Sequence, residues 1–173
     1  PGQVVTTNLL PLLGVSPIRG RLFTPEDGQE GQPDVAIISY SLWQRRFGGD
    51  ENLVGRTVQL NNLPRTIIGI LPEGFTWHVP RNSRTGKPAE IWSPWQITQD
   101  MLIRRGRFAC AVARLKPGVS FAQAQSEMDT IGSRLRQQYP DFNTNWGVTV
   151  VPLRLQFTGD IRTPLFILLG AVG

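Results

Sequence analysis

The sequence predicts an α+β fold made of a βαβ half and an inserted mixed α/β subdomain that contains a β-hairpin. Three patterns support this prediction. A short apolar strand over residues 35–38 runs directly into a capped helix, and two alternating segments flank Asn61 and Asn62 as in a hairpin. Further along, a long amphipathic helix over residues 121–138 lies between two more alternating segments, which is typical of a βαβ unit.

The composition is that of a folded globular protein. The chain has 173 residues, of which 40% are apolar, and its 18 Lys and Arg against 13 Asp and Glu give a formal charge of +5. This apolar content excludes a disordered segment, and 18 glycines without a G-x-y period exclude a collagen. Because the sequence begins at Pro1 and ends within an apolar run, we expect a longer parent polypeptide.

Residues 1–33 are expected to form an entry helix followed by a loop. Thr7 or Asn8 can cap a short helix that has Pro11 in its first turn and ends at Gly14. The polar stretch that follows, with its Gly and Pro residues, is typical of a loop.

The inserted subdomain is expected to span residues 34–106 and begins with a strand and a helix. Val35–Ile38 is a short apolar run of strand type. Ser39 can cap the helix that follows, and Gly48 can end it.

A β-hairpin follows in the same subdomain. The alternating runs 56–60 and 65–71 are joined by two asparagines, which tolerate the positive φ of a hairpin turn. Pro64 must lie at the start of the second strand or on an edge, because it has no N–H to donate. After the hairpin, part of a Pro-rich and Trp-rich stretch, Glu90–Trp92, should pair as a strand, since long structureless loops are rare in compact domains.

Residues 107–158 are expected to form the βαβ half. Arg107–Leu115 and Trp146–Leu153 alternate as strands do, and they should be parallel because a helix crosses between them. Ser120 and Gln123 form a capping box at the start of that helix. An apolar stripe on the helix is expected to pack on the two strands and consists of Phe121, Ala124, Met128, Ile131 and Leu135.

Residues 159–173 are expected to be a junction and the start of a transmembrane helix. The last nine residues, LFILLGAVG, are uncharged and apolar on every face, and a proline suits the first turn of a new helix. A span needs about 20 apolar residues, so an amphipathic or core helix stays the alternative. The predicted membrane junction consists of Pro164, Leu165, Phe166 and Ile167.

The reactive side chains predict no catalytic site, no metal site and no cofactor site. His78 is the only histidine and Cys110 the only cysteine, so the usual zinc sites and Cys–His pairs cannot be assembled from this chain. Cys110 falls between alanines in a predicted strand, where a buried, inert thiol is expected. The acidic pairs Glu26–Asp27 and Asp50–Glu51 lie in sequence typical of turns, which accounts for them without catalysis.

Five tryptophans and the excess of basic residues leave one alternative function open. A soluble binding module could stack the bases of single-stranded nucleic acid on tryptophans and hold phosphates with arginines. The densest basic groups, Arg45–Arg46 and Arg104–Arg107, fall short of a basic stripe, and core packing accounts for the tryptophans equally well.

Five blocks of the sequence, in this order, resemble the MacB-like periplasmic core domain of ABC transporter permeases, most of all the large permeases abundant in Acidobacteria. The blocks are LGVSPIRGRLFTPED (Leu13–Asp27), VAIISYSLWQRRFGGDENLVGRTVQLNN (Val35–Asn62), RTIIGILPEGF (Arg65–Phe75), ARLKPGVSFAQAQSEMDTI (Ala113–Ile131) and GDIRTPLFILLGAVG (Gly159–Gly173). Together they cover nearly the whole chain.

The resemblance implies a non-catalytic extracytoplasmic domain of a permease in the bacterial inner membrane. Residues 34–106 would be its Sabre-like subdomain, and residues 107–158 the second half of a porter-like subdomain whose first half precedes Pro1. The implied role is to engage partner proteins or substrate and to transmit movement driven by ATP hydrolysis. The implied partners are the remainder of the permease and the membrane. An ATP-binding subunit, periplasmic partner proteins and a homodimer stay open, and the resemblance implies no cofactor and no nucleic acid.

Overall fold

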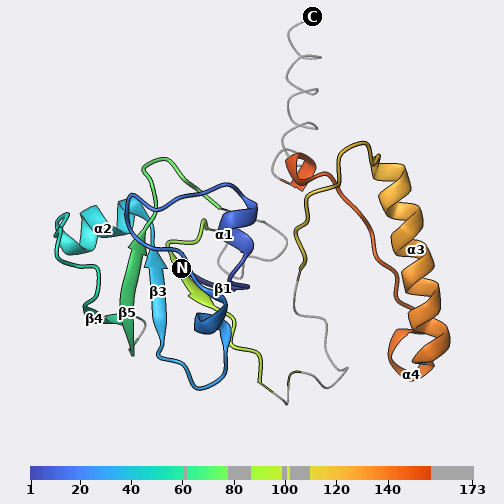
Figure 1. The fold of residues 1–173 in the computed structure, drawn as a ribbon, viewed down its shortest axis with the longest axis horizontal. Helices are drawn as coiled ribbons and strands as arrows, with labels where there is room; N and C mark the ends of the chain where they lie inside the picture. Colours follow the sequence, from blue (N-terminus) through green and yellow to red (C-terminus); the bar gives the residue numbers. More distant parts are fainter. Residues whose placement is uncertain (61, 78–86, 99–100, 102–109, 157–173) are drawn as a thin grey trace, which may run out of the picture. The chain divides into compact units, whose positions relative to one another are not determined.

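The computed structural model describes residues 1–60, 62–77, 87–98, 101 and 110–156. The chain divides into two compact units, one within Pro1–His78 and Ser83–Ile103 and the other within Val79–Asn82 and Arg104–Gly173. The first unit is built around a β-sheet and the second around one long helix (Figure 1). The predicted α+β fold class is confirmed.

A six-stranded mixed sheet organises the first unit. Along the sheet the strands follow the order β1, β6, β3, β5 and β2, and β4 pairs with β5. β1 is parallel to β6 and β3 to β5, whereas the other neighbours are antiparallel. The strands span Gly2–Val5 (β1), Arg19–Gly20 (β2), Val35–Ile38 (β3), Thr57–Leu60 (β4), Leu63–Ile70 (β5) and Ile91–Pro94 (β6).

Three of the predicted strand features are confirmed. β3 occupies the predicted range, and β4 and β5 pair as antiparallel strands, with Asn62 at a φ of 64° in the turn between them. Pro64 is the second residue of β5, close to the strand start that its missing N–H requires. The strand predicted at Glu90–Trp92 is present as β6.

The first 33 residues contain more structure than the predicted helix and loop. The helix is present as α1 (Leu9–Leu12), a single turn with Asn8 at its N-cap and with Gly14 at a φ of 74° just beyond its end. Strands β1 and β2 and the 3₁₀ turn Pro25–Gly28 were not predicted. Each strand pairs with a segment far along the chain, so no local pattern marks it.

Helix α2 (Tyr40–Phe47) forms as its end residues predict. The Ser39 side chain accepts a hydrogen bond from the backbone N–H of Leu42 at 3.1 Å. Gly48 ends the helix in the left-handed conformation, at a φ of 60°, where a side chain would be strained. The caps at Ser39 and Gly48 therefore set the two ends of the helix, and Leu42 is buried in the core.

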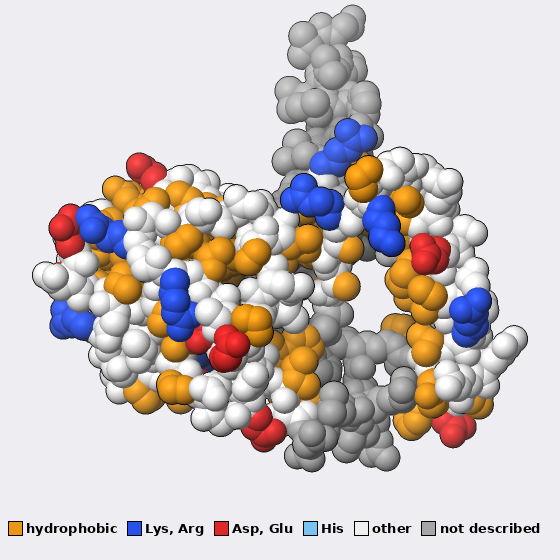
Figure 2. Space-filling view, viewed as in Figure 1, with side chains coloured by type: hydrophobic (Ala, Val, Ile, Leu, Met, Phe, Trp, Pro, Cys, Tyr) orange, Lys and Arg blue, Asp and Glu red, His pale blue; other side chains and the backbone are white. Residues whose placement is uncertain are grey.

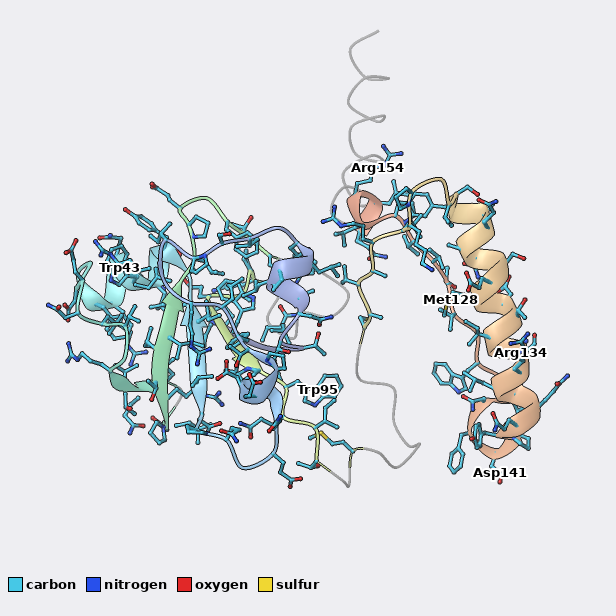
Figure 3. All side chains as sticks on the ribbon, in the orientation of Figure 1. Trp43, Trp95, Met128, Arg134, Asp141 and Arg154 are labelled. Atoms are coloured by element: carbon cyan, nitrogen blue, oxygen red, sulfur yellow. The ribbon has the colours of Figure 1, made fainter. Side chains whose placement is uncertain are left out.

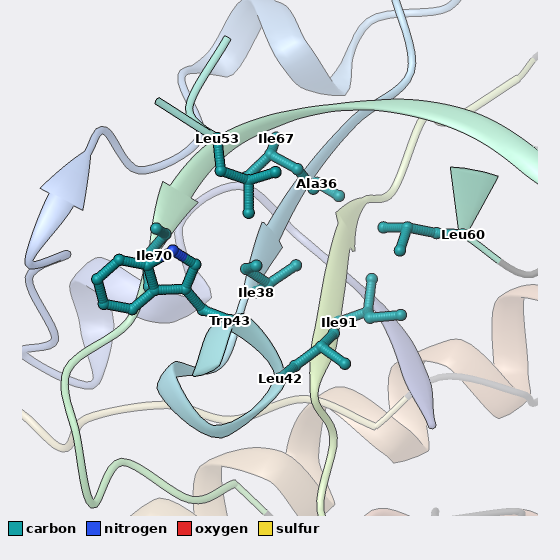
Figure 4. Close-up of a cluster of buried hydrophobic side chains, with 9 residues drawn as sticks. All are labelled: Ala36, Ile38, Leu42, Trp43, Leu53, Leu60, Ile67, Ile70 and Ile91. Carbon is teal, nitrogen blue, oxygen red and sulfur yellow. The ribbon is translucent and has the colours of Figure 1, made fainter. Parts of the chain in front are cut away.

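The core of the first unit lies between α2 and the sheet (Figure 4). A β-bulge between β3 and β5 leaves Ile68 as an extra residue, and this shift brings Ile67 and Ile70 to the same face. The buried cluster consists of Ala36, Ile38, Leu42, Trp43, Leu53, Leu60, Ile67, Ile70 and Ile91. The neighbouring strand residues Ile37 and Trp92 are also fully buried, and they point to the opposite face of the sheet.

The second unit contains α3 (Phe121–Gln138), the short α4 (Pro140–Asn143) and a helical turn over residues 153–156. The range of α3 and its capping box are confirmed. The N–H of Gln123 donates to Ser120 Oγ at 3.2 Å, and the N–H of Ser120 donates to Gln123 Oε1 at 2.8 Å.

The prediction of a strand on either side of α3 is wrong for the residues that the structure describes. Residues 110–115 form no strand, and neither do residues 146–152, while Leu153 begins a helical turn. A strand exists only where a neighbour completes its hydrogen-bond ladder, and the described part of this unit offers no such neighbour. The expected packing of α3 on a sheet is therefore also wrong here. Phe121 and Ile131 are exposed, and Met128 and Leu135 are only half-buried.

Candidate interaction surface

Of the two reactive residues singled out by the sequence, the structure describes only Cys110. His78 lies outside the described residues. Cys110 is exposed, which corrects the expectation of a buried thiol, because residues 110–115 belong to no strand that could cover it. Within the described ranges, no three His, Cys, Asp or Glu side chains gather as a possible metal site.

Three of the four acidic residues in these pairs, Asp27, Asp50 and Glu51, form ion pairs with arginines of the first unit. Asp50 accepts from Arg56 Nη1 at 2.7 Å, and its other carboxylate oxygen accepts from the N–H of Asn52 at 2.9 Å. Glu51 forms an ion pair with Arg19. These contacts give both residues of the pair a structural role, as the turn-like sequence predicts.

Asp27 makes the most buried of these ion pairs. Its side chain is 11% exposed and accepts two hydrogen bonds from Arg21, at 2.6 and 3.1 Å. It also accepts from the backbone N–H of Thr24 at 2.7 Å, which caps the 3₁₀ turn. The hydrogen bond from Arg21 is the main reason why the pKa of Asp27 is lowered, and burial opposes it in part.

Asp27→Asn should therefore destabilise the protein in a pH-dependent way. A carboxyl group whose pKa is lowered by folding stabilises the protein above its unfolded pKa, about 3.9, and this contribution is lost as the pH falls through the lower folded pKa. We expect a loss of about 1 to 3 kcal/mol at pH 7 and a smaller loss at pH 3, measured by urea unfolding. Glu30→Gln, in the exposed loop that follows, should change stability by less than about 0.5 kcal/mol at both pH values.

Three of the five tryptophans are unable to stack on a ligand. Trp43, Trp77 and Trp92 are buried in the first unit, and Trp43 Nε1 donates to the carbonyl oxygen of Asp50 at 2.9 Å. Trp95 is half-buried, and its Nε1 lies 3.2 Å from the sulfur of Met101. Trp146, in the second unit, is 55% exposed.

Exposed apolar side chains gather in the second unit, along α3 and the chain that returns beside it (Figure 2). We call this set the α3 surface. It consists of Phe121, Ile131, Phe142, Trp146, Val148, Val151 and Leu155. Large exposed apolar sets of this kind mark interaction sites in folded proteins.

Residues 146–150 run alongside α3 and are bonded to it by side chains (Figures 1 and 3). Arg136 Nη1 donates to the carbonyl oxygen of Trp146 at 2.9 Å, and its Nη2 donates to Ser133 Oγ at 2.8 Å. Gln125 bonds to two backbone groups further along, at Val148 and Val150. A hollow of about 90 Å³ lies between the helix and this segment and is lined by Gly132, Leu135, Asn143, Trp146, Gly147 and Val148.

Sequence reasoning missed Gln125 and Arg136 as contact residues. Neither residue belongs to the apolar stripe predicted on this helix, and nothing in the spacing marks a bond to a distant backbone. The predicted junction residues Pro164, Leu165, Phe166 and Ile167 lie outside the described residues. No helix in the described part of the chain is long and apolar enough to cross a membrane.

Comparison with protein families finds one family model that matches most of the chain. The model is described as the MacB-like periplasmic core domain, and it matches residues 2–131. The match thus runs from β1 through the sheet of the first unit and into the middle of α3.

The curated relatives are long transport proteins. A macrolide export ATP-binding/permease protein, MacB 1 of Yersinia pestis bv. Antiqua (strain Antiqua), is 25% identical over 101 residues, which are 57% of this chain and 14% of the relative. The corresponding protein of Burkholderia lata is 23% identical over 149 residues, or 85% of this chain and 20% of the relative. The chain therefore spans a fifth or less of the length of these relatives.

One solved structure has a similar fold. A domain described as part of a permease protein from Porphyromonas gingivalis has a TM-score of 0.50 and 19% identity, covering 88% of this chain and 68% of that one. The periplasmic region of MacB from Actinobacillus actinomycetemcomitans has a TM-score of 0.49 and 18% identity, covering 80% and 56%.

Proposed function

Because the chain belongs to the family of MacB-like periplasmic core domains, we propose that it is the non-catalytic extracytoplasmic domain of an ABC-type permease in the bacterial inner membrane. The observation that carries this proposal is the family match over residues 2–131, which includes the whole sheet of the first unit. In this role the domain engages partner proteins or substrate and transmits conformational change driven by ATP hydrolysis.

The proposal takes the two subdomains at the bounds that the family resemblance implies. Residues 34–106, which lie mostly in the first unit, form the Sabre-like subdomain, and residues 107–158, in the second unit, form the second half of a porter-like subdomain. The exposed α3 surface supports this assignment, because an apolar helix face needs a partner to bury it. The remainder of the permease supplies that partner.

The further partners in this proposal are an ATP-binding subunit and periplasmic proteins, with a second copy of the permease as a homodimer. The curated relatives are named as combined ATP-binding and permease proteins, which is the context that suggests such partners. The membrane itself is contacted at the junction Pro164, Leu165, Phe166 and Ile167, from which a transmembrane helix continues.

The alternative, a soluble module that binds single-stranded nucleic acid, has little support from the described surface. Its stacking platforms would be tryptophans, and Trp43, Trp77 and Trp92 are all buried. Phosphates would be held by arginines, and four of the described arginines already form ion pairs with acidic residues: Arg19, Arg21, Arg45 and Arg56.

The membrane junction can be tested on the isolated chain. We expect the full 173-residue chain to bind detergent micelles, and a chain ending at Asp160 to bind much less, because residues 165–172 are uncharged and apolar on every face. Light scattering during gel filtration measures the bound detergent. Both chains carry the same α3 surface, so a difference reports on the tail alone. Equal detergent binding by the two chains would contradict the junction.

A further inference from the structure

We propose that the side-chain amide of Gln125 mimics one residue of a β-strand and holds Val148–Val150 in the extended conformation before any sheet forms around it. Gln125 Nε2 donates to the carbonyl oxygen of Val148 at 2.8 Å, and its Oε1 accepts from the backbone N–H of Val150 at 2.7 Å. Gln125 is half-buried between α3 and the segment it bonds.

The two backbone groups that Gln125 contacts are those that a neighbouring parallel strand would contact. In a parallel ladder, the carbonyl before a residue and the N–H after it bond to the N–H and carbonyl of one residue on the next strand. The carbonyl of Val148 and the N–H of Val150 flank Thr149 in this way. A primary amide offers one donor and one acceptor side by side, so Gln125 takes the place of that single residue.

The orientation of the Gln125 amide is fixed by a third hydrogen bond. Its Nε2 also donates to Asp129 Oδ1 at 2.8 Å, one helical turn further along α3. A carboxylate accepts and a backbone N–H donates, so only one placement of the amide oxygen and nitrogen satisfies Asp129 and Val150 together. Arg136 adds a second anchor by donating to the carbonyl of Trp146 at 2.9 Å.

The opposite edge of the segment is left for a partner strand. Residues alternate along an extended chain, so Gly147 and Thr149 direct their backbone groups away from α3. Among the described residues, no hydrogen bond reaches the backbone of either one. The partner that fits this edge is an extended strand from the remainder of the permease, which would add to it by main-chain hydrogen bonds. This last step rests on the proposed function, whereas the contact made by Gln125 does not.

Amide hydrogen exchange, measured by NMR on the 173-residue chain, tests the role of Gln125. In Gln125→Ala, the N–H of Val150 should exchange at least about fivefold faster, the change that corresponds to losing about 1 kcal/mol of hydrogen bonding. Asp129→Ala should produce a smaller acceleration, because the amide keeps its two backbone partners but loses its fixed orientation. Gln138→Ala, an exposed glutamine on the same helix, should leave the rate unchanged.

Alanine favours helix, so α3 should persist in these variants, and far-UV circular dichroism checks this. A rate for Val150 within about twofold of the parent chain in Gln125→Ala would overturn the proposal, since one hydrogen bond is worth more than that. An equal acceleration in Gln138→Ala would also overturn it, because it would indicate general opening of the unit. Neither result bears on membrane placement, so this proposal and the proposed function can fail separately.

Discussion

Trp92→Ala is expected to lower the free energy of unfolding of the first unit by about 3 to 5 kcal/mol. Trp92 is fully buried at the centre of β6, and its ring lies 5.9 Å from that of Phe75. Alanine would leave a large cavity on the face of the sheet opposite α2, and it cannot close without moving backbone because β6 is held between β1 and β3. Small domains are stable by only about 5 to 15 kcal/mol, so this loss should be visible as a large shift of the urea midpoint.

Leu63→Ala is the control for this measurement. Leu63 belongs to the same sheet, at the start of β5, but is 50% exposed, so its truncation should cost less than about 1 kcal/mol. Both variants can be followed by far-UV circular dichroism. A loss of less than about 1 kcal/mol for Trp92→Ala would contradict its place in the core.

Gly20→Ala is expected to cost about 2 to 4 kcal/mol, because two penalties combine at this residue. Its φ is 75°, in the left-handed region, and an added Cβ would lie 2.1 Å from the carbonyl oxygen of Ile68. That oxygen belongs to the bulge of β5 and accepts a hydrogen bond from the N–H of Arg21, so it cannot move aside freely. On the facing strand, a Cβ at Gly69 would lie 2.4 Å from the carbonyl oxygen of Arg21.

Gly31→Ala separates the two penalties at Gly20. Gly31 has a similar φ of 81°, but nothing lies within 4 Å of an added Cβ. It should therefore cost only the backbone strain, about 1 to 2 kcal/mol. Urea unfolding of both variants gives the difference. Equal losses would show that β2 and β5 do not approach each other as closely as the structure has them.

The parts of the fold that could be predicted are those fixed by local chemistry. Ser39 and Gly48 delimit α2, and Ser120 with Gln123 opens α3, because capping groups act within one helical turn. The turn at Asn62 is local in the same sense. Strands β1 and β2 could not be predicted, since their partners lie far along the chain and their own residues carry no clear alternation.

The errors in the second unit have one physical cause. Alternation over 107–115 and 146–153 indicates which side chains share a face, but it does not supply the neighbouring strand that a ladder requires. In the structure, side chains of α3 instead bond three backbone groups of this segment, the carbonyls of Trp146 and Val148 and the N–H of Val150. The contacts of Gln125 and Arg136 depend on this segment lying beside α3, so no sequence pattern predicts them. The predicted junction at 164–167 stays a prediction.

Thiol labelling of Cys110 in the parent permease tests the account most directly. Cys110 is exposed, so it can report the side of the membrane on which the domain lies. Cells with an intact inner membrane are treated with a membrane-impermeant maleimide, and Cys110→Ser identifies the signal that belongs to this residue. A cysteine in place of Glu30, exposed in the first unit, gives a second, independent position. If the domain is extracytoplasmic, as proposed, both positions should be labelled from outside. Labelling that appears only after the inner membrane is lysed would place the domain in the cytoplasm and contradict it.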